Sequence, residues 1–161
     1  MKMIACIQED GGLGYKGDLL YFFKEDLEHF KKTTLDSAIV MGYNTWVSLP
    51  NKPLPKRDNI VLCSNNEQVE MVSGTGAIFL RNIDNLAQLE KDLGKEVYII
   101  GGGFVYKQTI NLCEKIILTE VRGQNKLADT FFPLDKLTEN FKKITERKLL
   151  EGVYIVEYER K

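Results

Sequence analysis

Val97-Tyr98-Ile99-Ile100-Gly101-Gly102-Gly103 is the stretch of sequence that decides the expected fold. Its first four residues are apolar or aromatic without alternation, which is typical of a strand covered on both faces, as in a parallel sheet. Three glycines follow and lead into a helical stretch over residues 104–111. Ligands of parallel α/β sheets bind at the edge where strands turn into helices, so this turn is a candidate phosphate site. A tight turn alone would also explain the glycines, whose spacing is not that of a dinucleotide fingerprint.

The rest of the chain alternates β-rich runs with helical stretches and has no linker, which predicts one α/β domain over residues 1–161. Strands are expected over residues 3–7, 38–41, 59–63, 77–80, 97–100 and 115–121. Helices are expected over residues 22–34, 45–49, 83–93 and 104–111, and Gly94 is a natural stop for the third. Residues 141–149 and 153–159 look like a closing antiparallel pair across Glu151-Gly152. The expected sheet is therefore mostly parallel with an antiparallel edge.

The composition is that of an ordinary globular domain of 161 residues with a net charge of −1. No run approaches the roughly 18 apolar residues of a membrane span, and the N-terminal segment turns polar at Gln8 before a secretory apolar region forms. Three cysteines without CxxC spacing, beside a single histidine, argue against disulfides, structural zinc and a Cys–His catalytic pair. We expect a cytoplasmic protein, with nothing that demands more than a monomer, that binds a small molecule rather than nucleic acid or a membrane.

Asp26 is an acid on the apolar side of the expected helix over residues 22–34. At about 100° per residue it lies between Phe22 and Phe30 on the helical wheel, and the charged side chains occupy the opposite arc. His29 falls at the boundary of the polar face, where we expect it to be solvated. A buried carboxylate without partners loses much hydration energy, so it is usually paired, and an enzyme can pair it with substrate.

Four further features each have a functional interpretation and a plain structural one. Thr45 follows a strand end, where it can cap the next helix or hold a phosphate. Arg57 stands on a loop stiffened by prolines, where it can clamp a carboxylate or form a solvated basic turn. The glycine-rich loop over residues 9–14 is either a lid or a connector. Thr119 lies in an expected strand, where β propensity alone would explain it.

Taken together, these segments resemble dihydrofolate reductase, and the match runs nearly end to end in order and spacing. It rests on Ile4-Ala5, Leu13-Gly14, Asp26-Leu27, Phe30-Lys31, Val40-Met41-Gly42, Thr45-Trp46, Pro53-Leu54-Pro55, Arg57, Asn59-Ile60, Ile100-Gly101-Gly102-Gly103, Val105-Tyr106, Leu118-Thr119, Asp129-Thr130 and Phe132-Pro133. The resemblance implies a three-layer fold, with an eight-stranded, mostly parallel central sheet, an antiparallel C-terminal edge and about four flanking helices. It also implies a cis peptide at Gly101-Gly102, which sequence rules alone would not predict because such bonds are costly.

The implied activity is NADPH-dependent reduction of 7,8-dihydrofolate to 5,6,7,8-tetrahydrofolate, which supplies one-carbon metabolism. By resemblance, Asp26 bonds N3 and the 2-amino group of the pterin and raises the basicity of N5, where a water delivers the proton, while NADPH supplies a hydride to C6. Thr119 would support the carboxylate, Tyr21 would stand beside it, and Arg57 would bind the α-carboxylate of the glutamate tail. Antifolate inhibitors are expected to bind the same site.

The resemblance also assigns the lining of the site. The apolar walls of the substrate site would be Ile4, Leu27, Phe30, Leu49, Leu54 and Ile100. Cys6, also counted among the substrate-binding residues, would border the nicotinamide together with Ile100. The pyrophosphate region would fall to Gly42, Asn44, Thr45 and Gly101, Gly102 and Gly103, and the 2′-phosphate to Ser64. The full cofactor site would further include Cys6, Ile7, Leu13, Gly14, Leu19, Tyr43, Leu62, Cys63, Arg81, Ile100, Phe104, Val105 and Tyr106.

The chain departs from the family pattern in two places. Leu20-Tyr21 replaces the usual Pro-Trp ahead of the catalytic helix, so we expect altered antifolate affinity and slower turnover, although a tyrosine hydroxyl can substitute for the indole as a donor. Tyr43 and Phe104 stand where arginines are common at the adenosine end. Neither can neutralise a phosphate, so NADPH preference is expected to be weaker, with NADH use left open, unless Arg81 or a lysine reaches in.

Two other functions stay open. The reductase of riboflavin synthesis shares the fold and the cofactor end, but its ribosylaminopyrimidine phosphate has no pterin amidine edge for Asp26 and no glutamate tail for Arg57. A non-catalytic nucleotide-binding protein would bind the cofactor without oxidising it and would use Asp26 as a structural acid. Loss of reduced cofactor in the presence of dihydrofolate separates these interpretations.

Overall fold

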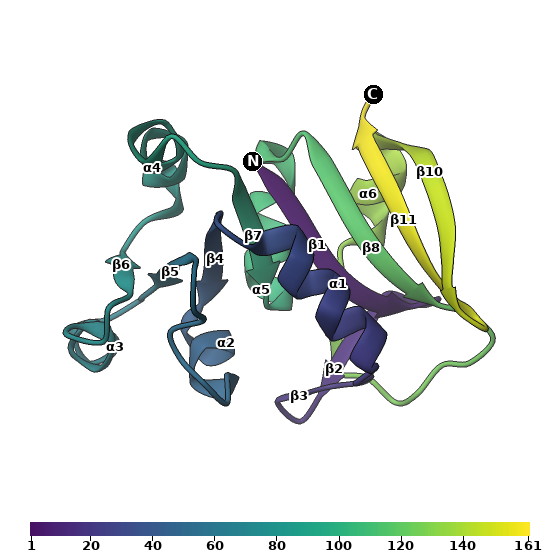
Figure 1. Ribbon diagram of the computed structural model, residues 1–161, viewed down its shortest axis with the longest axis horizontal. Coiled ribbons are helices and arrows are strands. Elements are labelled where there is room, and N and C mark those ends of the chain that lie inside the picture. Colours follow the sequence, from purple (N-terminus) through teal and green to yellow (C-terminus); the bar gives the residue numbers. More distant parts are fainter.

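The central sheet has eight strands in the order β10-β11-β8-β1-β7-β4-β5-β6 (Figure 1). The computed structural model describes all of residues 1–161. The strands are β1 Lys2–Gln8, β4 Ala38–Gly42, β5 Asp58–Leu62, β6 Ile78–Leu80, β7 Val97–Gly101, β8 Lys115–Val121, β10 Phe141–Leu150 and β11 Val153–Arg160. β11 runs antiparallel to β8 and β10, and the other pairings are parallel. The predicted sheet, mostly parallel with an antiparallel edge, is confirmed.

A second sheet of three short strands, in the order β3-β2-β9, was not predicted. It consists of β2 Gly12–Tyr15, β3 Asp18–Leu19 and β9 Thr130–Phe131. Strands this short, one of them glycine-rich, carry no alternation that a sequence pattern can detect. Gly12 pairs with Phe131, so the loop after β1 is tied to the segment that follows β8.

Six α-helices cover the central sheet: α1 Lys24–Thr34, α2 Tyr43–Ser48, α3 Asn66–Val72, α4 Leu86–Leu93, α5 Gly103–Thr109 and α6 Leu134–Asn140. They exceed the expected number because α3 and α6, of seven residues each, are too short to show an apolar period. Asn65 was the available signal for α3, since its side chain accepts the Gln68 N–H at 2.9 Å as an N-cap. None of the helices has the length and apolar character needed to cross a membrane.

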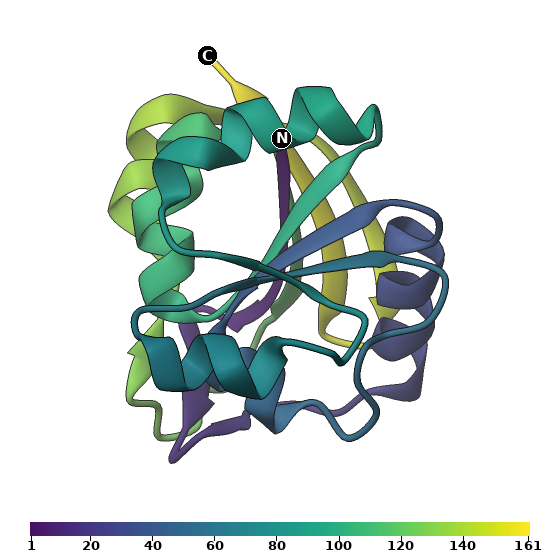
Figure 2. The ribbon, with the colours of Figure 1, turned by 90° about the vertical axis from the view of Figure 1, so that its left-hand side faces the viewer.

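Helices lie on both faces of the sheet, which makes three layers, and Figure 2 shows α5 and α6 on one side of the strands with α1 on the other. The larger core cluster joins α4, α5 and α6 to side chains such as Ile7, Ile99 and Leu118. The smaller cluster joins α2 and α3 to Ile4 and Met41, and the Phe30 side chain of α1 packs against it. Neighbouring strand residues thus face opposite layers, as the pleat requires.

Candidate active site

The Asp26 carboxylate lies in the first turn of α1. The Thr119 hydroxyl of β8 donates a hydrogen bond of 2.5 Å to Asp26 Oδ1, and Thr119 itself is buried. In the sheet, Thr119 pairs with Cys6 of β1. Helix N-termini and hydroxyl donors both stabilise a carboxylate. The structure therefore brings together the acid and the threonine that were singled out from the sequence.

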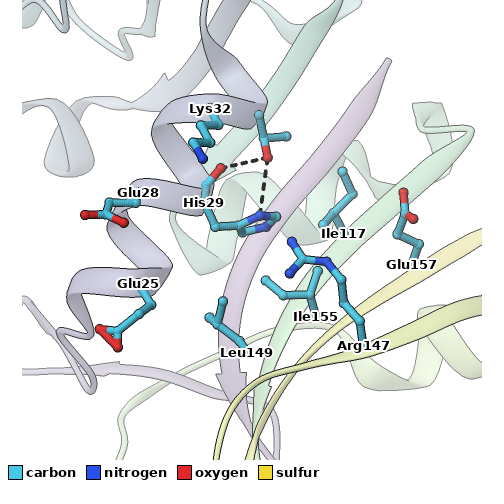
Figure 3. Close-up of a pocket in the computed structure, with 10 residues that line it drawn as sticks. Glu25, Glu28, His29, Lys32, Ile117, Arg147, Leu149, Ile155 and Glu157 are labelled. Carbon is cyan, nitrogen blue, oxygen red and sulfur yellow. Dashed lines mark hydrogen bonds between the residues drawn. The ribbon is translucent and has the colours of Figure 1, made fainter.

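The face that α1 turns toward the sheet differs from the predicted one. Phe22 precedes the helix and is 67% exposed, and Leu27 is 53% exposed. His29 was expected to be solvated but is half-buried in a groove of about 550 Å³ between α1 and the strands β8, β10 and β11, beside Ile117 and Ile155 (Figure 3). A helical wheel that starts at Phe22 therefore predicted apolar side chains to be buried in the core that the fold leaves exposed.

Cys6 lies close to Asp26 and behaves as a packing thiol. Burial, and then the Asp26 carboxylate, raise the pKa of the Cys6 thiol. A thiol that stays protonated is a poor nucleophile, so Cys6 contributes volume rather than covalent chemistry. Cys63 and Cys113 are also buried, and none of the three cysteines is paired.

Most of the predicted apolar walls belong to one cluster. Phe30, Leu49, Leu54 and Ile100 are partly buried and pack against the core cluster that contains Ile4. These residues come from α1, from the segment after α2, from the end of β7 and from the middle of β1. These apolar side chains are only partly buried, so they can still pack against a flat ligand.

Arg57 is held in place without a carboxylate partner. Its Nε donates to the Pro55 carbonyl at 2.9 Å, and its Nη1 donates to the Thr34 hydroxyl at the end of α1 at 3.1 Å. Burial lowers its pKa from the ordinary value, but a guanidinium still remains charged at neutral pH. Its Nη2, which makes no hydrogen bond, can donate to an external carboxylate, so a loosely solvated basic turn does not describe this residue.

The glycine turn after β7 lies beside the end of β4. The peptide between Gly101 and Gly102 is cis, as the resemblance implied. A Cβ on Gly102 would lie 3.5 Å from the Thr45 hydroxyl, and a Cβ on Gly42 would lie 3.0 Å from the Val105 side chain. Glycine at these positions keeps the two strand ends close together with their backbones open, which is the form of a phosphate cradle.

The expected adenosine end carries a hydroxyl and a cation. Ser64 follows β5, is exposed, and bonds the Gln68 side chain through its backbone N–H at 2.8 Å. Arg81 follows β6 and donates to the Asn66 side chain. Burial raises the pKa of Cys63, whereas the charge of Arg81 lowers it. Phe104 is 73% exposed and free to stack on a ligand ring.

Several predicted cofactor residues present their side chains to the core instead. Ile7, Leu13, Val105 and Tyr106 are buried in the larger core cluster. The Tyr106 hydroxyl donates to the Ile4 carbonyl at 2.7 Å, which ties α5 to β1. Other predicted members are exposed or partly exposed residues of the second sheet, of the start of α2 or of the end of β5, namely Gly14, Leu19, Tyr43, Asn44 and Leu62.

Tyr21 is buried, and its hydroxyl is committed elsewhere than expected. It donates to Gln8 Oε1 at 2.9 Å, and its ring stacks on Phe23 with the centroids 5.6 Å apart. Gln8 is fully buried at the end of β1. Sequence reasoning missed Gln8, although a polar residue that ends an apolar strand was a usable signal.

Comparisons with known proteins agree with this geometry. A family model described as dihydrofolate reductase matches residues 1–153. A dihydrofolate reductase of Buchnera aphidicola subsp. Acyrthosiphon pisum is 34% identical over 148 residues, covering 92% of this chain and 88% of that protein. Dihydrofolate reductase type 9 of Escherichia coli is 33% identical over 159 residues, covering 92% and 87%. The structure of dihydrofolate reductase from Enterococcus faecalis complexed with NADP(H) and RAB-propyl matches with a TM-score of 0.82 and 26% identity, covering 99% of this chain and 95% of that one.

Proposed function

The chain belongs to the dihydrofolate reductase family, and from this premise we propose that it reduces 7,8-dihydrofolate to 5,6,7,8-tetrahydrofolate with NADPH. Such an activity supplies one-carbon units for the synthesis of thymidylate and purines. The observation that carries the proposal is the pairing of Asp26 with Thr119 beside an apolar cluster, together with Arg57, which bonds the end of α1 and has no carboxylate partner. A pterin with a glutamate tail needs one acid and one cation separated by apolar walls, and this arrangement supplies them.

The residues of the chain bind and orient the substrate and favour its protonation by water at N5. Asp26 accepts hydrogen bonds from N3 and the 2-amino group, which fixes the ring and favours a proton at N5. Thr119 holds the carboxylate by its hydroxyl, so that Asp26 stays aimed at the ring. Arg57 binds the α-carboxylate of the glutamate tail through Nη2, its nitrogen without a hydrogen-bond partner in the chain. Bound NADPH supplies the hydride.

The cofactor end of the site suits NADPH. The glycines at the ends of β4 and β7 would accept the pyrophosphate, and Tyr43 and Phe104 can stack on adenine. Arg81 donates to the side chain of Asn66, two residues after Ser64, and we expect its guanidinium to meet the 2′-phosphate where Tyr43 and Phe104 cannot. We therefore expect a clear preference for NADPH over NADH.

The compartment and the assembly are part of the same proposal. Three unpaired thiols suit a reducing compartment, which supports a cytoplasmic location. A complete site built from one chain supports a monomer. Antifolates are expected to compete with dihydrofolate, with affinities altered by Tyr21, whose hydroxyl faces Gln8.

A steady-state assay with the purified chain tests the function. We expect loss of reduced cofactor when dihydrofolate and NADPH are both present, and no loss when either is omitted. Oxidation that requires a ribosylaminopyrimidine phosphate instead of dihydrofolate would identify the pyrimidine reductase activity. Cofactor binding without oxidation under any of these conditions would leave a nucleotide-binding protein. The comparisons favour neither alternative.

A further inference from the structure

One buried amide joins three segments of chain around the expected pterin end. Gln8 Oε1 accepts the Tyr21 hydroxyl at 2.9 Å and the backbone N–H of Lys126 at 2.8 Å, while its Nε2 donates to the Lys126 carbonyl at 2.7 Å. These partners fix the orientation of the amide, because a flipped amide would set its NH₂ group against the Lys126 N–H. The Tyr21 hydroxyl hydrogen is therefore committed to Gln8.

Lys126 contacts the same segment, at Leu20 and Tyr21, from the surface of the protein. It is exposed, in the stretch that joins β8 to β9, which runs back along the lower edge of the molecule in Figure 1. Its Nζ donates to the Leu20 carbonyl at 2.9 Å and lies 4.5 Å from the centroid of the Tyr21 ring. No carboxylate forms an ion pair with Lys126, so its ammonium group interacts with the Leu20 carbonyl and the Tyr21 ring instead.

Leu20 and Tyr21 lead directly into the helix that carries Asp26. Tyr21 stacks on Phe23, the residue that precedes the first turn of α1. The Phe23 carbonyl accepts the N–H groups of Asp26 at 3.1 Å and Leu27 at 3.0 Å. A shift of Tyr21 would thus be passed through Phe23 to the helix start, and from there to the Asp26 carboxylate.

We propose that Gln8 and Lys126 are positioning residues for Asp26, which act through Tyr21 at the Leu20-Tyr21 pair. This inference rests on the proposed function. β8 holds the Asp26 carboxylate through Thr119, and the stretch after β8 holds the segment that leads into the same helix through Lys126. β8 and the stretch that follows it therefore fix both the orientation of the Asp26 carboxylate and the position of the helix that carries it. Any water beside Tyr21 can only donate to the phenol oxygen.

Lys126→Met tests the contacts of Lys126 with Leu20 and Tyr21, because methionine keeps most of the length of the side chain and loses its charge. We expect kcat/KM for dihydrofolate to fall roughly tenfold, because the variant loses both a cation–π contact and a charged hydrogen bond. Lys126→Arg, which keeps the charge, should retain most of the parent value of kcat/KM. The KM for NADPH should stay within about twofold, since the cofactor end is untouched. Lys91→Met, on α4 at the far end of the sheet, removes the same charge as a control.

A double-mutant cycle shows whether Lys126 acts through Tyr21. In a Tyr21→Leu background the ring is gone, so Lys126→Met should have little further effect. Tyr21→Phe, which keeps the ring and the cation contact, should lower kcat/KM less than Tyr21→Leu. Full additivity of Lys126→Met with Tyr21→Leu, or equal behaviour of Lys126→Met and Lys91→Met, would overturn the proposal. A parent chain without dihydrofolate-dependent oxidation would instead overturn the proposed function, whatever the Lys126 variants do.

Discussion

Thr119 donates its hydroxyl hydrogen to the Asp26 carboxylate at 2.5 Å, so a central strand of the sheet holds the one acid that faces the site from α1. Thr119→Val keeps the shape of the side chain and removes the donor. A hydrogen bond to a charged group is worth about 1.5–3 kcal/mol, so kcat/KM for dihydrofolate should fall roughly 10- to 100-fold. Thr145→Val, on exposed β10, serves as the control. Unchanged kinetics of Thr119→Val would mean that Asp26 needs no such support.

Arg57→Met is expected to weaken binding of the glutamate tail. Because Arg57 lies away from the reacting atoms, the change should raise the KM for dihydrofolate while leaving kcat nearly unchanged. A pterin substrate that lacks the glutamate tail should be reduced equally well by both proteins. Lys56→Met, on the same loop, is the control, and its KM should match that of the parent chain. An equal loss with the tail-less substrate would remove Arg57 from tail recognition.

Arg81→Met is expected to lower the preference for NADPH. The loss of one cation beside the 2′-phosphate should reduce kcat/KM for NADPH by about tenfold and leave the value for NADH unchanged. Arg147→Met, at the opposite edge of the sheet, tests whether any lost arginine has this effect. Parallel losses with both cofactors would show that Arg81 acts on the fold rather than on the phosphate.

His29 should make the folded chain less stable at mildly acidic pH. Burial, and then Arg147, lower its pKa from the ordinary value, whereas the Asp26 and Glu157 carboxylates act in the opposite direction. The unfolded chain then binds a proton more readily than the folded one. The stability contributed by neutral His29 is present above about pH 6.5 and is lost as the pH falls through the lowered folded pKa. Chemical denaturation at a series of pH values measures this loss.

His29→Gln is the matched variant for that measurement. It should lose less free energy of unfolding than the parent chain between about pH 7 and pH 5, because glutamine binds no proton in this range. His29 is the single histidine of the chain, so its imidazole signal in NMR spectra reports its folded pKa directly. An imidazole that titrates at or above the ordinary value would contradict the prediction.

Parallel strands were predictable because they are covered on both faces. The run over residues 97–103 needs apolar side chains on two sides and glycines at the turn, and these requirements are visible in the sequence itself. The unusual position of Asp26 was also visible in the sequence, since a charged residue on the apolar side of a helix interrupts the apolar period. Thr119 followed only from the resemblance, because a threonine in a strand has an ordinary explanation.

The orientation of α1 was not predictable from its apolar period. Leu27 is left open by the fold, whereas His29 packs toward the sheet, and a helical wheel cannot tell an apolar side chain meant for a ligand from one meant for the core. The partners Gln8 and Lys126 lie 118 positions apart in the chain. Only the fold brings such residues together, and neither belongs to a recognisable motif.

The most direct test of the central role of Asp26 is the rate of hydride transfer by Asp26→Asn in single-turnover experiments at neutral pH. Asparagine keeps the shape of the side chain but carries no charge to favour a proton at N5. The account predicts a loss of about 10²- to 10⁴-fold, which shrinks as the pH falls and the substrate gains its proton from solution. Glu28→Gln, on the exposed side of α1, should transfer hydride at the parent rate. Hydride transfer by Asp26→Asn at the parent rate would contradict the account.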